Sequence, residues 1–459
     1  MTLPYSCLLT SYSIEFFSGS PHHYLLLDMS VQKREIFGWA MYDFANSAFA
    51  TTILAVIFNQ YFASVVAGGE KGVKVLGFHL HGASFFTFAL AASMVLSAVL
   101  SPFLGAVADA SGTKKRFMMV FCYTAILCTG LLYFVQAGDY WVGAIFFMVA
   151  NIGFAEGNVF YNAFLPEISN QQNIGRISGF GWASGYIGGG VLLAINLMML
   201  KYPEWIGFPK GYFTVQDCFL SVAVWWLIFS IPTFLFLRER AQRIKRSGEV
   251  HYIRAGYRRL QHTFQRIRSF RELTKFLIAF LIYNDGIETV IVMASIFGAE
   301  VLGMETSEII LFFLMIQGIA FLGSLIFGLL ADAIGNKRTV MITLGIWSLI
   351  VLWAYALGIV WDPKTEYWIL GVVAALVLGG SQAASRSLQG IFTPDANSAE
   401  FFAFFGVSGK FASIFGPLIY GILITLTGSV RSGILSILIF FIIGLFILWT
   451  VDEKKGMEE

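Results

Sequence analysis

The chain has 459 residues, of which 57% are hydrophobic and only 13% are charged, and its mean hydropathy is +0.73. The charged share is about half of that in an average soluble domain. A soluble fold of this length would expose too much apolar surface, whereas the 46 glycines and 46 phenylalanines suit close helix packing and contact with acyl chains. The composition therefore excludes an ordinary soluble protein and indicates a protein that crosses the membrane many times.

The four cysteines, Cys7, Cys122, Cys128 and Cys218, form no CxxC pair and no Cys/His cluster. Neither a disulfide framework nor a zinc site is indicated, and no cofactor or metal is expected. Cys122 and Cys128 stand within an apolar run, which is typical of small buried hydrophobic side chains.

Residues 1–35 are expected to form an N-terminal tail. Residues 1–28 contain no Lys or Arg, and their apolar piece, residues 24–27, is too short for the core of a signal peptide. Met29 precedes Lys33, Arg34 and the first long apolar run. We therefore expect translation to begin at Met29, which leaves residues 1–28 untranslated or as a disordered tail.

Twelve apolar runs are long enough to cross a bilayer, which requires about 20 mostly apolar residues. They cover residues 38–66, 83–108, 117–137, 140–164, 178–200, 217–237, 273–299, 307–331, 339–360, 367–391, 403–427 and 432–450. The sequence therefore predicts an all-α membrane protein with twelve transmembrane helices.

The Lys and Arg residues are unevenly distributed between the two sides of the predicted membrane protein. With a cytoplasmic N-terminus, the cytoplasmic side holds the 238–275 cluster and Lys33, Arg34, Lys114, Lys115, Arg116, Arg176, Lys337, Arg338, Arg386, Lys410, Lys454 and Lys455. The opposite side holds only Lys71, Lys74, Lys201, Lys210, Lys364 and Arg431. Because basic loops favour the cytoplasmic side, we expect a multi-pass protein of the cell (inner) membrane with both termini in the cytoplasm.

The longest polar connection, residues 238–275, carries twelve Lys and Arg side chains. Between the arginines, apolar residues recur at helical spacing: Ile253, Tyr257, Leu260, Phe264 and Ile267. A basic amphipathic helix of this kind binds anionic lipid, which we expect as the partner in preference to nucleic acid or a regulatory protein. The connection divides the chain into an N-terminal six-helix bundle (36–238), a linker (239–272), a C-terminal six-helix bundle (273–451) and a tail (452–459).

The two halves repeat at a nearly constant spacing along the chain. The loop after the second helix reads GAVADASGTKK from Gly105, and the loop after the eighth helix reads GLLADAIGNKR from Gly328. Two further pairs match at almost the same spacing: Phe164-Leu-Pro-Glu with Phe392-Thr-Pro-Asp, and Phe180-Gly181 with Phe405-Gly406. A duplicated six-helix unit is a recurrent transporter architecture, with the substrate site between the halves near the bilayer midplane.

Polar side chains inside the predicted spans gather on four helices, the first and fourth of each half. At about 100° per residue, they form one narrow face on each helix, and charged residues inside a bilayer mark functional sites. A network that only holds helices together is the simpler reading of a single amide, but four coincident faces with three acids and one arginine favour a solute pathway. We expect a small-molecule substrate to meet Asp43, Asn46, Ser47, Asn158, Tyr161, Asn162, Asn284, Asp285, Glu288, Gln382, Ser385, Arg386 and Gln389.

Four acidic residues are candidates for proton coupling: Asp43, Glu156, Asp285 and Glu288. Asp285 and Glu288 stand one turn apart, so their mutual repulsion should favour protonation of one of them. Glu156 points away from the polar face of the fourth helix, so pairing with a neighbouring helix is slightly favoured over proton transfer. Arg386 is expected to bind a substrate carboxylate or to pair with Asp43, Asp285 or Glu288.

The two repeated loops are expected to form a gate on the cytoplasmic side. Glycine allows close helix crossing, and each aspartate stands at a helix end, where a carboxylate can meet the N-terminus of a neighbouring helix. The following basic residues supply the opposite charge, although topology signalling alone would also explain them. The expected gate comprises Gly105, Asp109, Gly112, Lys114, Lys115, Arg116, Gly328, Asp332, Gly335, Lys337 and Arg338.

These paired loops resemble the signature loop of the major facilitator superfamily. More specifically, the chain resembles the vacuole-effluxer family, which is named for an autophagy-related fungal protein. The stretches that carry this resemblance are YDFANSAF from Tyr42, FYNAFLPE from Phe160, GWASGYIGGG from Gly181, YNDG from Tyr283 and Ser385-Arg386-Ser387.

The resemblance spans residues 36–451 and implies a major-facilitator fold of two pseudo-symmetric six-helix bundles that rock around a central site. It also implies amino-acid export, the role associated with the fungal members. Without long soluble insertions, the chain resembles a compact prokaryotic member. Glu156, Glu288 and the basic 238–275 segment are not part of the family pattern.

The expected function is secondary active transport of small zwitterionic solutes, such as amino acids, by export or exchange, with proton coupling as one option. Arg386 would meet a carboxylate, and an acid among Asp43, Asp285 and Glu288 would meet an amine or a proton. A multidrug or sugar porter is the alternative within the superfamily, because sugar sites use Asn, Gln and aromatic residues. An intramembrane enzyme is disfavoured by the lack of an HExxH motif, a Cys/His set or a Ser/His pair, and a receptor by the lack of a sizeable soluble domain.

Overall fold

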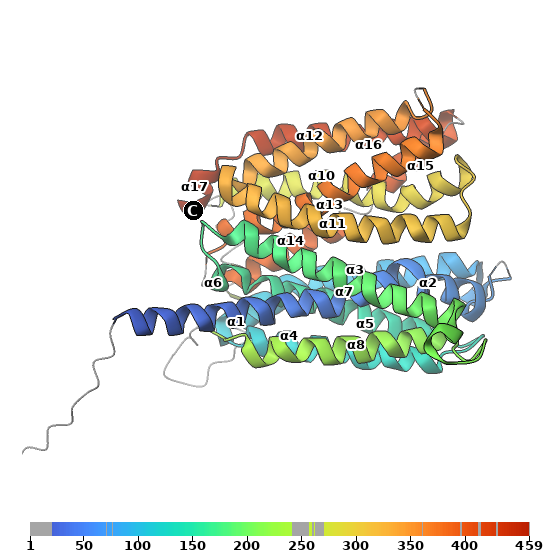
Figure 1. The fold of residues 1–459 in the computed structure, drawn as a ribbon, viewed down its shortest axis with the longest axis horizontal. Helices are drawn as coiled ribbons and strands as arrows, with labels where there is room; N and C mark the ends of the chain where they lie inside the picture. The colour runs from blue at the N-terminus through green and yellow to red at the C-terminus, as the bar shows by residue number, and fades with distance from the viewer. Residues whose placement is uncertain are drawn as a thin grey trace, which may run out of the picture.

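The structure is a computed structural model, and it describes residues 21–69, 71–75, 77–240, 257, 258, 261, 270–359, 361–394, 397–411, 415–427 and 430–458. Long helices run side by side along one axis of the molecule (Figure 1). Strands within the described ranges are confined to one antiparallel hairpin of β1 (Val73–Val75) and β2 (Phe78–Leu80), with Val73 opposite Leu80. The prediction of an all-α membrane protein is confirmed.

The first span of the N-terminal half alternates between α-helical and π-helical segments. α1 (Pro21–Ala48) continues into a π-helical segment, η1 (Phe49–Val56), and then into α2 (Phe58–Tyr61) and a second π-helical segment, η2 (Phe62–Val66). The later elements are α3 (Gly82–Ser111), α4 (Lys114–Leu131), η3 (Leu132–Phe134), α5 (Tyr140–Asn162), α6 (Leu165–Ile168), α7 (Ile174–Lys201), η4 (Pro203–Ile206) and α8 (Val215–Phe236).

The C-terminal half repeats this order of long helices. Its elements are α10 (Arg271–Glu300), α11 (Thr306–Ile334), α12 (Asn336–Tyr355), α13 (Pro363–Ile391), α14 (Ser398–Phe411), α15 (Phe415–Thr427), α16 (Val430–Trp449) and α17 (Glu453–Glu458). The C-terminus, the α3–α4 loop and the α11–α12 loop lie at one end of the bundle, which we call the basic end because it holds Lys33, Lys114, Lys337 and Lys454 (Figure 1). The opposite end is called the far end.

Local sequence explains where several helices begin and end. Asp362 accepts a hydrogen bond from the backbone N–H of Thr365 at 3.0 Å, and Pro363 follows it at the first position of α13. Thr214 and Asp217 form a reciprocal cap at the start of α8. Gly112 ends α3 with a φ of +59°, a conformation that glycine adopts without steric cost.

Eleven helices in the described ranges are long and apolar enough to cross a membrane. They correspond to all but one of the twelve predicted spans. The remaining span, 403–427, contains α14 and α15, and residues 412–414 lie outside the described residues. The disordered tail expected over residues 1–28 is helical from Pro21 onward, and no further proline interrupts α1 before its end at Ala48. Residues 1–20 and most of the 239–272 linker lie outside the described residues.

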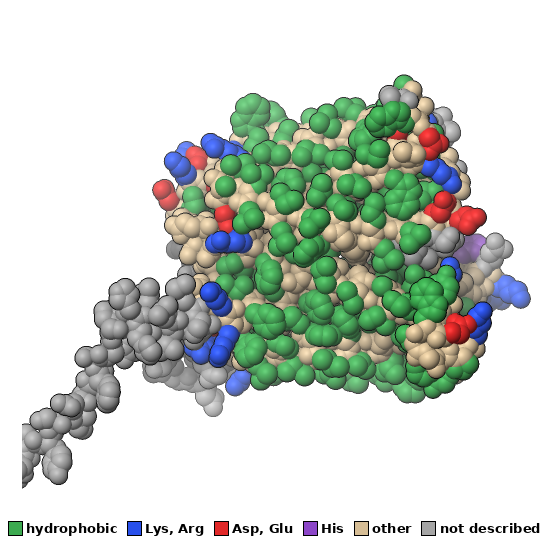
Figure 2. Space-filling view, viewed as in Figure 1, with side chains coloured by type: hydrophobic (Ala, Val, Ile, Leu, Met, Phe, Trp, Pro, Cys, Tyr) green, Lys and Arg blue, Asp and Glu red, His purple; other side chains and the backbone are tan. Residues whose placement is uncertain are grey.

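Each half contains its own cluster of buried apolar side chains. The first includes Trp39, Phe58 and Trp226, and the second includes Phe276 and Trp347. Hydrophobic side chains also cover the long outer face, while charged side chains lie toward its two ends (Figure 2). An apolar band between two charged rims is what a bilayer requires, so the chain is a multi-pass membrane protein.

The halves meet through two pairs of helices that the sequence repeat relates. α3 packs on α14, and α11 packs on α7. α7 also contacts α13, while α14 contacts α5 as well as its own neighbour α10. α14 therefore lies between the two halves.

Candidate transport pathway and gates

Arg386 on α13 forms a buried contact between the two halves. Its Nη1 lies 2.9 Å from Oδ2 of Asp43 on α1, and its Nε and Nη2 donate to Oγ (3.0 Å) and the carbonyl oxygen (2.6 Å) of Ser178 on α7. Nη1 also donates to Oδ1 of Asn162 at 3.4 Å, and the Tyr161 hydroxyl donates to Asp43 at 2.8 Å. Among the acidic partners predicted for Arg386, the structure selects Asp43, and further hydrogen bonds satisfy both members of this buried pair.

Aromatic rings enclose the Arg386 guanidinium. Its central carbon lies 4.9 Å from the ring centre of Trp39, 5.0 Å from that of Trp182 and 5.7 Å from that of Tyr161. Trp39 stacks on Tyr161 with ring centres 4.6 Å apart, and its indole N–H donates to the Tyr161 carbonyl oxygen at 3.0 Å. Because cation–π attraction is strongest for desolvated cations, these rings hold the guanidinium where the halves meet.

A second buried contact between the halves joins Lys410 on α14 to α3 and α5. Its Nζ donates to Oγ of Ser97 at 2.7 Å and of Ser101 at 3.1 Å, and lies 3.4 Å from Oε1 of Glu156. Both serine hydroxyls donate to the same Oε1, Ser101 at 2.6 Å. The other Glu156 oxygen, Oε2, is buried without a hydrogen-bond partner among the described residues.

Glu156 thus pairs with neighbouring helices, the arrangement slightly favoured from the sequence. The cytoplasmic positions that the charge count gave to Lys410 and Arg386 are wrong. Arg386 lies within α13 and Lys410 within α14, and each has buried polar partners in the opposite half.

Asp285 on α10 caps the N-terminus of α15. Its Oδ1 and Oδ2 accept hydrogen bonds from the backbone N–H groups of Gly416 (2.9 Å) and Phe415 (3.1 Å). A carboxylate at this position satisfies free N–H groups and complements the helix dipole. A Cβ atom at Gly416 would lie 1.9 Å from Oγ1 of Thr289 and 2.8 Å from Oδ1 of Asp285, so only glycine allows this approach. In this structure Asp285 therefore supports the start of a short helix.

Glu288 and Asn284 lie on the same helix as Asp285, but neither has a hydrogen bond or ion pair with another described residue. Glu288 is partly exposed. On the polar face predicted for α10, the Asp285 carboxylate therefore has hydrogen-bond partners, whereas the Glu288 carboxylate has none among the described residues.

Two of the predicted polar residues on α1 and α5 bind each other. Nδ2 of Asn46 donates to Oδ1 of Asn158 at 2.7 Å. This hydrogen bond stays within the N-terminal half, and it is the kind of interhelical amide contact that stabilises membrane bundles.

The polar face of α13 has partners in both halves. Gln382 accepts a hydrogen bond from the Tyr186 hydroxyl of α7, across the halves. The Ser385 hydroxyl lies 2.6 Å from that of Tyr283, and Gln389 donates to Thr393 at 3.2 Å, both within the C-terminal half.

A cavity of about 300 Å³ lies between the halves on the far side of the Arg386–Asp43 contact. Ser47 lines it one helical turn beyond Asp43 on α1, and Gln382 lines it one turn before Arg386 on α13. Because α1 and α13 run in opposite directions, both relations place the ion pair nearer to the basic end than the cavity. The ion pair therefore stands between the cavity and the basic end.

The cavity combines a few neutral polar groups with many aromatic ones. Its polar side chains are Ser47, Thr51, Tyr186, Gln317 and Gln382, and its aromatic side chains include Trp182, Phe297, Phe312, Phe313, Trp347, Tyr367 and Tyr420. The indole Nε1 of Trp182 is buried without a hydrogen-bond partner among the described residues. Ala50, Thr51 and Ala55 belong to η1, and such π-helical segments occur frequently at functional sites.

The repeated segment 105–116, for which we use the name α3–α4 loop, includes the last turns of α3 and the start of α4. It contacts the N-terminus of α14 in the opposite half. Oδ1 and Oδ2 of Asp109 accept hydrogen bonds from the backbone N–H groups of Ala399 (3.2 Å) and Glu400 (2.9 Å). A Cβ atom at Gly105 would lie 2.6 Å from the Ala399 carbonyl oxygen, so glycine permits the close approach of α3.

The repeated segment 328–338, for which we use the name α11–α12 loop, includes the last turns of α11 and the start of α12. It makes the equivalent contact with α7. Oδ1 and Oδ2 of Asp332 accept hydrogen bonds from the N–H groups of Gly175 (2.7 Å) and Arg176 (3.1 Å). A Cβ atom at Gly328 would lie 2.8 Å from the Gly175 carbonyl oxygen, and Gly335 has a φ of +98°. The predicted contact between each aspartate and the N-terminus of a neighbouring helix is confirmed, whereas the gating role stays a prediction.

The basic residues of the α3–α4 loop have different partners. Lys114 is fully buried, forms an ion pair with Glu167 at the end of α6, and donates to the Ser398 hydroxyl of α14 at 2.6 Å. Lys115 donates to the carbonyl oxygen of Leu237, at the C-terminus of α8, at 2.6 Å. Arg116 is exposed. Within this loop, Lys114 is therefore the basic residue that crosses between the halves.

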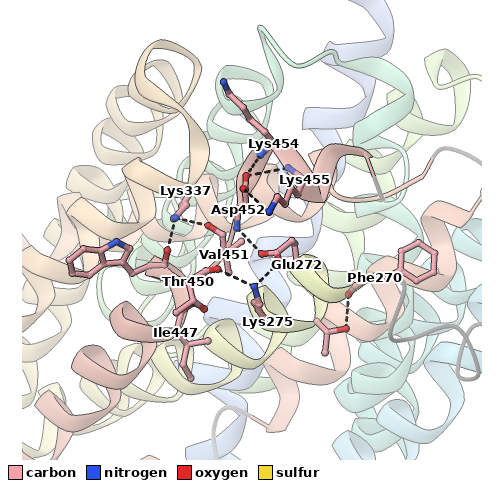
Figure 3. A network of polar contacts seen from close by, with 12 residues as sticks. Phe270, Glu272, Lys275, Lys337, Ile447, Thr450, Val451, Asp452, Lys454 and Lys455 are labelled. Atoms are coloured by element: carbon pink, nitrogen blue, oxygen red, sulfur yellow. Dashed lines mark hydrogen bonds and ion pairs between the residues drawn. The ribbon is translucent and has the colours of Figure 1, made fainter.

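Lys337 in the α11–α12 loop stays within its own half. Its Nζ donates to the carbonyl oxygens of Trp449 (2.8 Å) and Val451 (2.6 Å) at the end of α16, beside Glu272 and Lys275 of α10 (Figure 3). The next residue, Arg338, is exposed.

Two glutamates outside the spans complete these loops. Glu239 accepts a hydrogen bond from the backbone N–H of Lys115 at 2.7 Å, and Glu453 accepts one from that of Asn336 at 3.1 Å. Burial raises the pKa of both carboxyl groups, and the backbone hydrogen bonds oppose that rise. The two halves therefore share a capped helix start at this position.

Several residues of these contacts were not predicted from the sequence. Trp39 stands one turn before Asp43, and this spacing could have placed it on the same face. Lys410 lies inside a predicted span, and an intramembrane lysine is itself a signal for a buried partner. Ser178 and Trp182 gave no such signal, because serine and tryptophan are common in membrane helices. No group of three or more His, Cys, Asp or Glu side chains suited to a metal occurs in the described ranges.

The fold is that of a major-facilitator transporter. The solved structure of XylE, a major facilitator superfamily proton:xylose symporter, matches with a TM-score of 0.65 and 13% identity, covering 93% of this chain and 96% of XylE. The human organic anion transporter MFSD10 matches with a TM-score of 0.66 and 13% identity, covering 91% of this chain and 99% of its own. At this identity the likeness shows the fold alone.

Sequence comparison identifies the family. A model of the family described as "Vacuole effluxer Atg22 like" matches residues 31–459, so the chain belongs to this family. It is 32% identical over 422 residues to the uncharacterized MFS-type transporter YxiO of Bacillus subtilis, covering 92% of this chain and 95% of YxiO. It is 24% identical over 479 residues to autophagy-related protein 22 of Eremothecium gossypii, covering 94% and 93%. The protein is therefore a major-facilitator secondary transporter and not an enzyme.

Proposed function

We propose that the protein exports or exchanges small zwitterionic solutes, such as amino acids, by alternating access of its two halves. The observation that carries this proposal is the cavity between the halves, which has neutral hydrogen-bonding groups and is separated from the basic end by the Arg386–Asp43 pair. The contacts of Asp109 and Asp332 lie at the same end. In this state the solute site is closed toward the basic end, and opening there requires these contacts to break.

The cavity offers complementary groups for a zwitterion. A carboxylate needs donors, and the indole N–H of Trp182 and the amides of Gln317 and Gln382 supply them. An ammonium group needs an acceptor, for which Glu288 is our candidate, because Val290 and Ile291 of the same helix line the cavity. The aromatic lining accommodates an apolar side chain.

Arg386 takes part in the cycle after the halves begin to move. Its guanidinium belongs to the C-terminal half, while Asp43 and Ser178 belong to the N-terminal half. Separation of the halves at the basic end would remove these partners and leave a buried cation, which is costly. A substrate carboxylate that reached Arg386 at that moment would lower this cost.

Glu288 is the acidic residue that we propose for proton coupling. The other candidates already have direct partners: Asp43 binds Arg386, Glu156 binds Lys410, and Asp285 caps α15. A carboxylate that lacks such a partner can lose or gain a proton without breaking an existing contact.

We further propose that the basic end faces the cytoplasm of a cell whose plasma, or inner, membrane holds the protein. The basic loops support this orientation through the preference of Lys and Arg for the cytoplasmic side. The basic 238–275 segment would then contact anionic lipid of the inner leaflet, as its amphipathic pattern predicts.

Transport in proteoliposomes tests the proposal. The wild-type protein should move labelled amino acids, and a pH gradient should change the rate. Glu288→Gln should abolish the effect of the gradient. Asp285→Asn is the matched control, because asparagine also caps a helix, so this variant should keep the pH response. If Asp285→Asn loses the response while Glu288→Gln keeps it, the coupling assignment is wrong.

A second function, transport of apolar drugs or of sugars, is favoured by one observation, the many aromatic side chains in the cavity. The same proteoliposomes separate the two functions. Uptake of a lipophilic cation or a sugar, with no movement of any amino acid, would overturn the amino-acid proposal.

A further inference from the structure

A second cavity, of about 510 Å³, lies at the basic end on the outer surface of the bundle. α1 contributes Lys33 and Ile36, α7 contributes Arg176 and Phe180, and α11 contributes Leu325 and Leu329. The first two helices belong to the N-terminal half and the third to the C-terminal half. We call this cavity the α1–α7–α11 groove, and it is separate from the transport cavity.

The groove is basic at one end and apolar along its length. Lys33 is exposed, and the Arg176 side chain is 62% exposed, with its Nε 3.9 Å from Oδ2 of Asp332. An exposed ion pair at this distance contributes little, so the guanidinium can turn toward another anion. With two cations and one carboxylate, the basic end of the groove keeps a net positive charge.

The apolar walls lie on the outer face of the molecule rather than in its core. The Phe180 side chain is 40% exposed and that of Leu329 is 54% exposed. Phe180 follows Arg176 by about one helical turn, and Leu329 precedes Asp332 by about one turn. Both therefore lie on the membrane side of these charged residues. A soluble anion would use the basic end of the groove but would leave these walls exposed to lipid tails.

We propose that the α1–α7–α11 groove binds an anionic phospholipid, whose phosphate lies between Lys33 and Arg176 and whose acyl chain packs on Phe180 and Leu329. Positively charged side chains next to a membrane attract anionic headgroups, and the walls offer a surface for hydrocarbon. This site is distinct from the contact expected for the 238–275 segment.

The bound lipid favours the conformation seen here. α7 and α11 approach each other through the Asp332 contact, and the groove spans the same two helices. Movement of α11 away from α7 would separate the two walls of the groove. The lipid should therefore hold the basic end closed, while depletion of anionic lipid should ease its opening.

Native mass spectrometry of the full chain tests the site. The purified protein is mixed with equal amounts of phosphatidylglycerol and phosphatidylcholine, and bound lipids are counted. The wild type should retain phosphatidylglycerol preferentially, and Lys33→Gln/Arg176→Gln should lower that preference by about tenfold. Arg34→Gln/Lys454→Gln removes the same charge from exposed residues outside the groove and should keep the preference.

Two further measurements make the result decisive. Leu329→Trp narrows the groove without changing its charge, so it should weaken retention of both lipids. This variant also tests the role of the apolar walls if the charge variant fails to fold. Phosphatidylglycerol should raise the melting temperature of the wild-type protein, whereas glycerol 3-phosphate, which has no acyl chains, should not. Equal retention of the two lipids by the wild type, equal loss in both double variants, or full replacement by glycerol 3-phosphate would overturn the proposal.

Discussion

The α3–α4 and α11–α12 loops come from the same repeated sequence, but they connect the halves to different extents. Asp109 and Asp332 make equivalent contacts with the N-termini of α14 and α7. Lys114 adds an ion pair and a hydrogen bond that reaches α14, whereas the basic residue of the second loop, Lys337, binds only carbonyl groups of its own half. The first loop is therefore the more strongly attached one.

The difference arises because the second helix start is shifted by one position. The repeat aligns Lys114 with Lys337, but α4 begins at Lys114 whereas α12 begins at Asn336, just before Lys337. Lys115 thus occupies the structural position of Lys337, since both donate to the C-terminal carbonyls of the last helix of their half. Lys114 corresponds to Asn336, which binds Ser387 within the C-terminal half. The duplicated loops have diverged at the position that faces the opposite half.

The largest effect is expected from removal of Lys114. Lys114→Met leaves the buried carboxylate of Glu167 without its cation, so stability should fall by about 3–5 kcal/mol. Lys337→Met removes hydrogen bonds to carbonyl groups and should cost about 1.5–3 kcal/mol. Thermal unfolding in one detergent measures both. Equal losses would show that the two loops contribute equally.

A smaller effect is expected from the aspartates. Asp109→Ala or Asp332→Ala removes two hydrogen bonds from backbone N–H groups to a carboxylate, which should cost about 2 kcal/mol. Asp→Asn at the same positions should retain most of the contact, because asparagine also accepts from helix N-termini.

Opening of each contact can be measured by maleimide labelling of a single cysteine, in a background without native cysteines. The cysteine replaces the buried Ala399 or Ala331, and the labelling rate reports opening. Because Lys114 also holds α14, opening at Ala399 in Asp109→Ala should be slower than opening at Ala331 in Asp332→Ala. The reverse order would contradict the comparison of the two loops.

Substitution of the glycines should have similar effects in the two loops. A methyl group at Gly105 or Gly328 would clash with backbone of the opposite half, at 2.6 Å and 2.8 Å respectively. Gly→Ala at either position should therefore cost about 1–3 kcal/mol and shift the protein toward the state that is open at the basic end. The same labelling rates measure this shift, and an unchanged rate in either variant would show that the helices tolerate wider spacing.

The smallest effect concerns pH. Burial raises the pKa of Glu239 and Glu453 above their ordinary value of 4.5, so the folded state prefers the protonated form. This contribution to stability is complete below pH 4.5 and is lost as pH rises through the raised pKa. Partial exposure screens the effect to less than about 1 kcal/mol for each residue.

Glu239→Gln and Glu453→Gln should each flatten the decline of the melting temperature between pH 4.5 and neutrality, and by similar amounts. The slopes of the two variants across this range provide the comparison. A steeper decline in either variant would mean that its carboxylate is stabilised when ionised, contrary to the effect of burial.

Much of the architecture could be predicted from the sequence because hydropathy and repetition act locally. Runs of apolar residues define spans, and the recurrence of the GxxxD loops defines the halves. The contact of Asp109 and Asp332 with neighbouring helices was also predictable, since a carboxylate at a helix end has few other stabilising partners in a membrane.

The pairing of the polar groups could not be predicted from helical faces alone. A face shows that Asp43 and Asp285 point inward, but it does not show which helix lies opposite. Asp285 meets the N-terminus of α15 because α10 packs on α15, and Lys410 reaches Glu156 because α14 packs on α3 and α5. Both facts depend on tertiary packing, which hydropathy does not record.

The aromatic enclosure of Arg386 has a spectroscopic consequence. Trp39 and Trp182 belong to the N-terminal half, while the guanidinium between them belongs to the C-terminal half. A positive charge beside an indole changes the energy of its excited state, so withdrawal of Arg386 would shift the emission of both tryptophans. Trp39 and Trp182 are two of the eleven tryptophans of the chain, so in a background without the other nine their emission would report separation of the halves without an attached label.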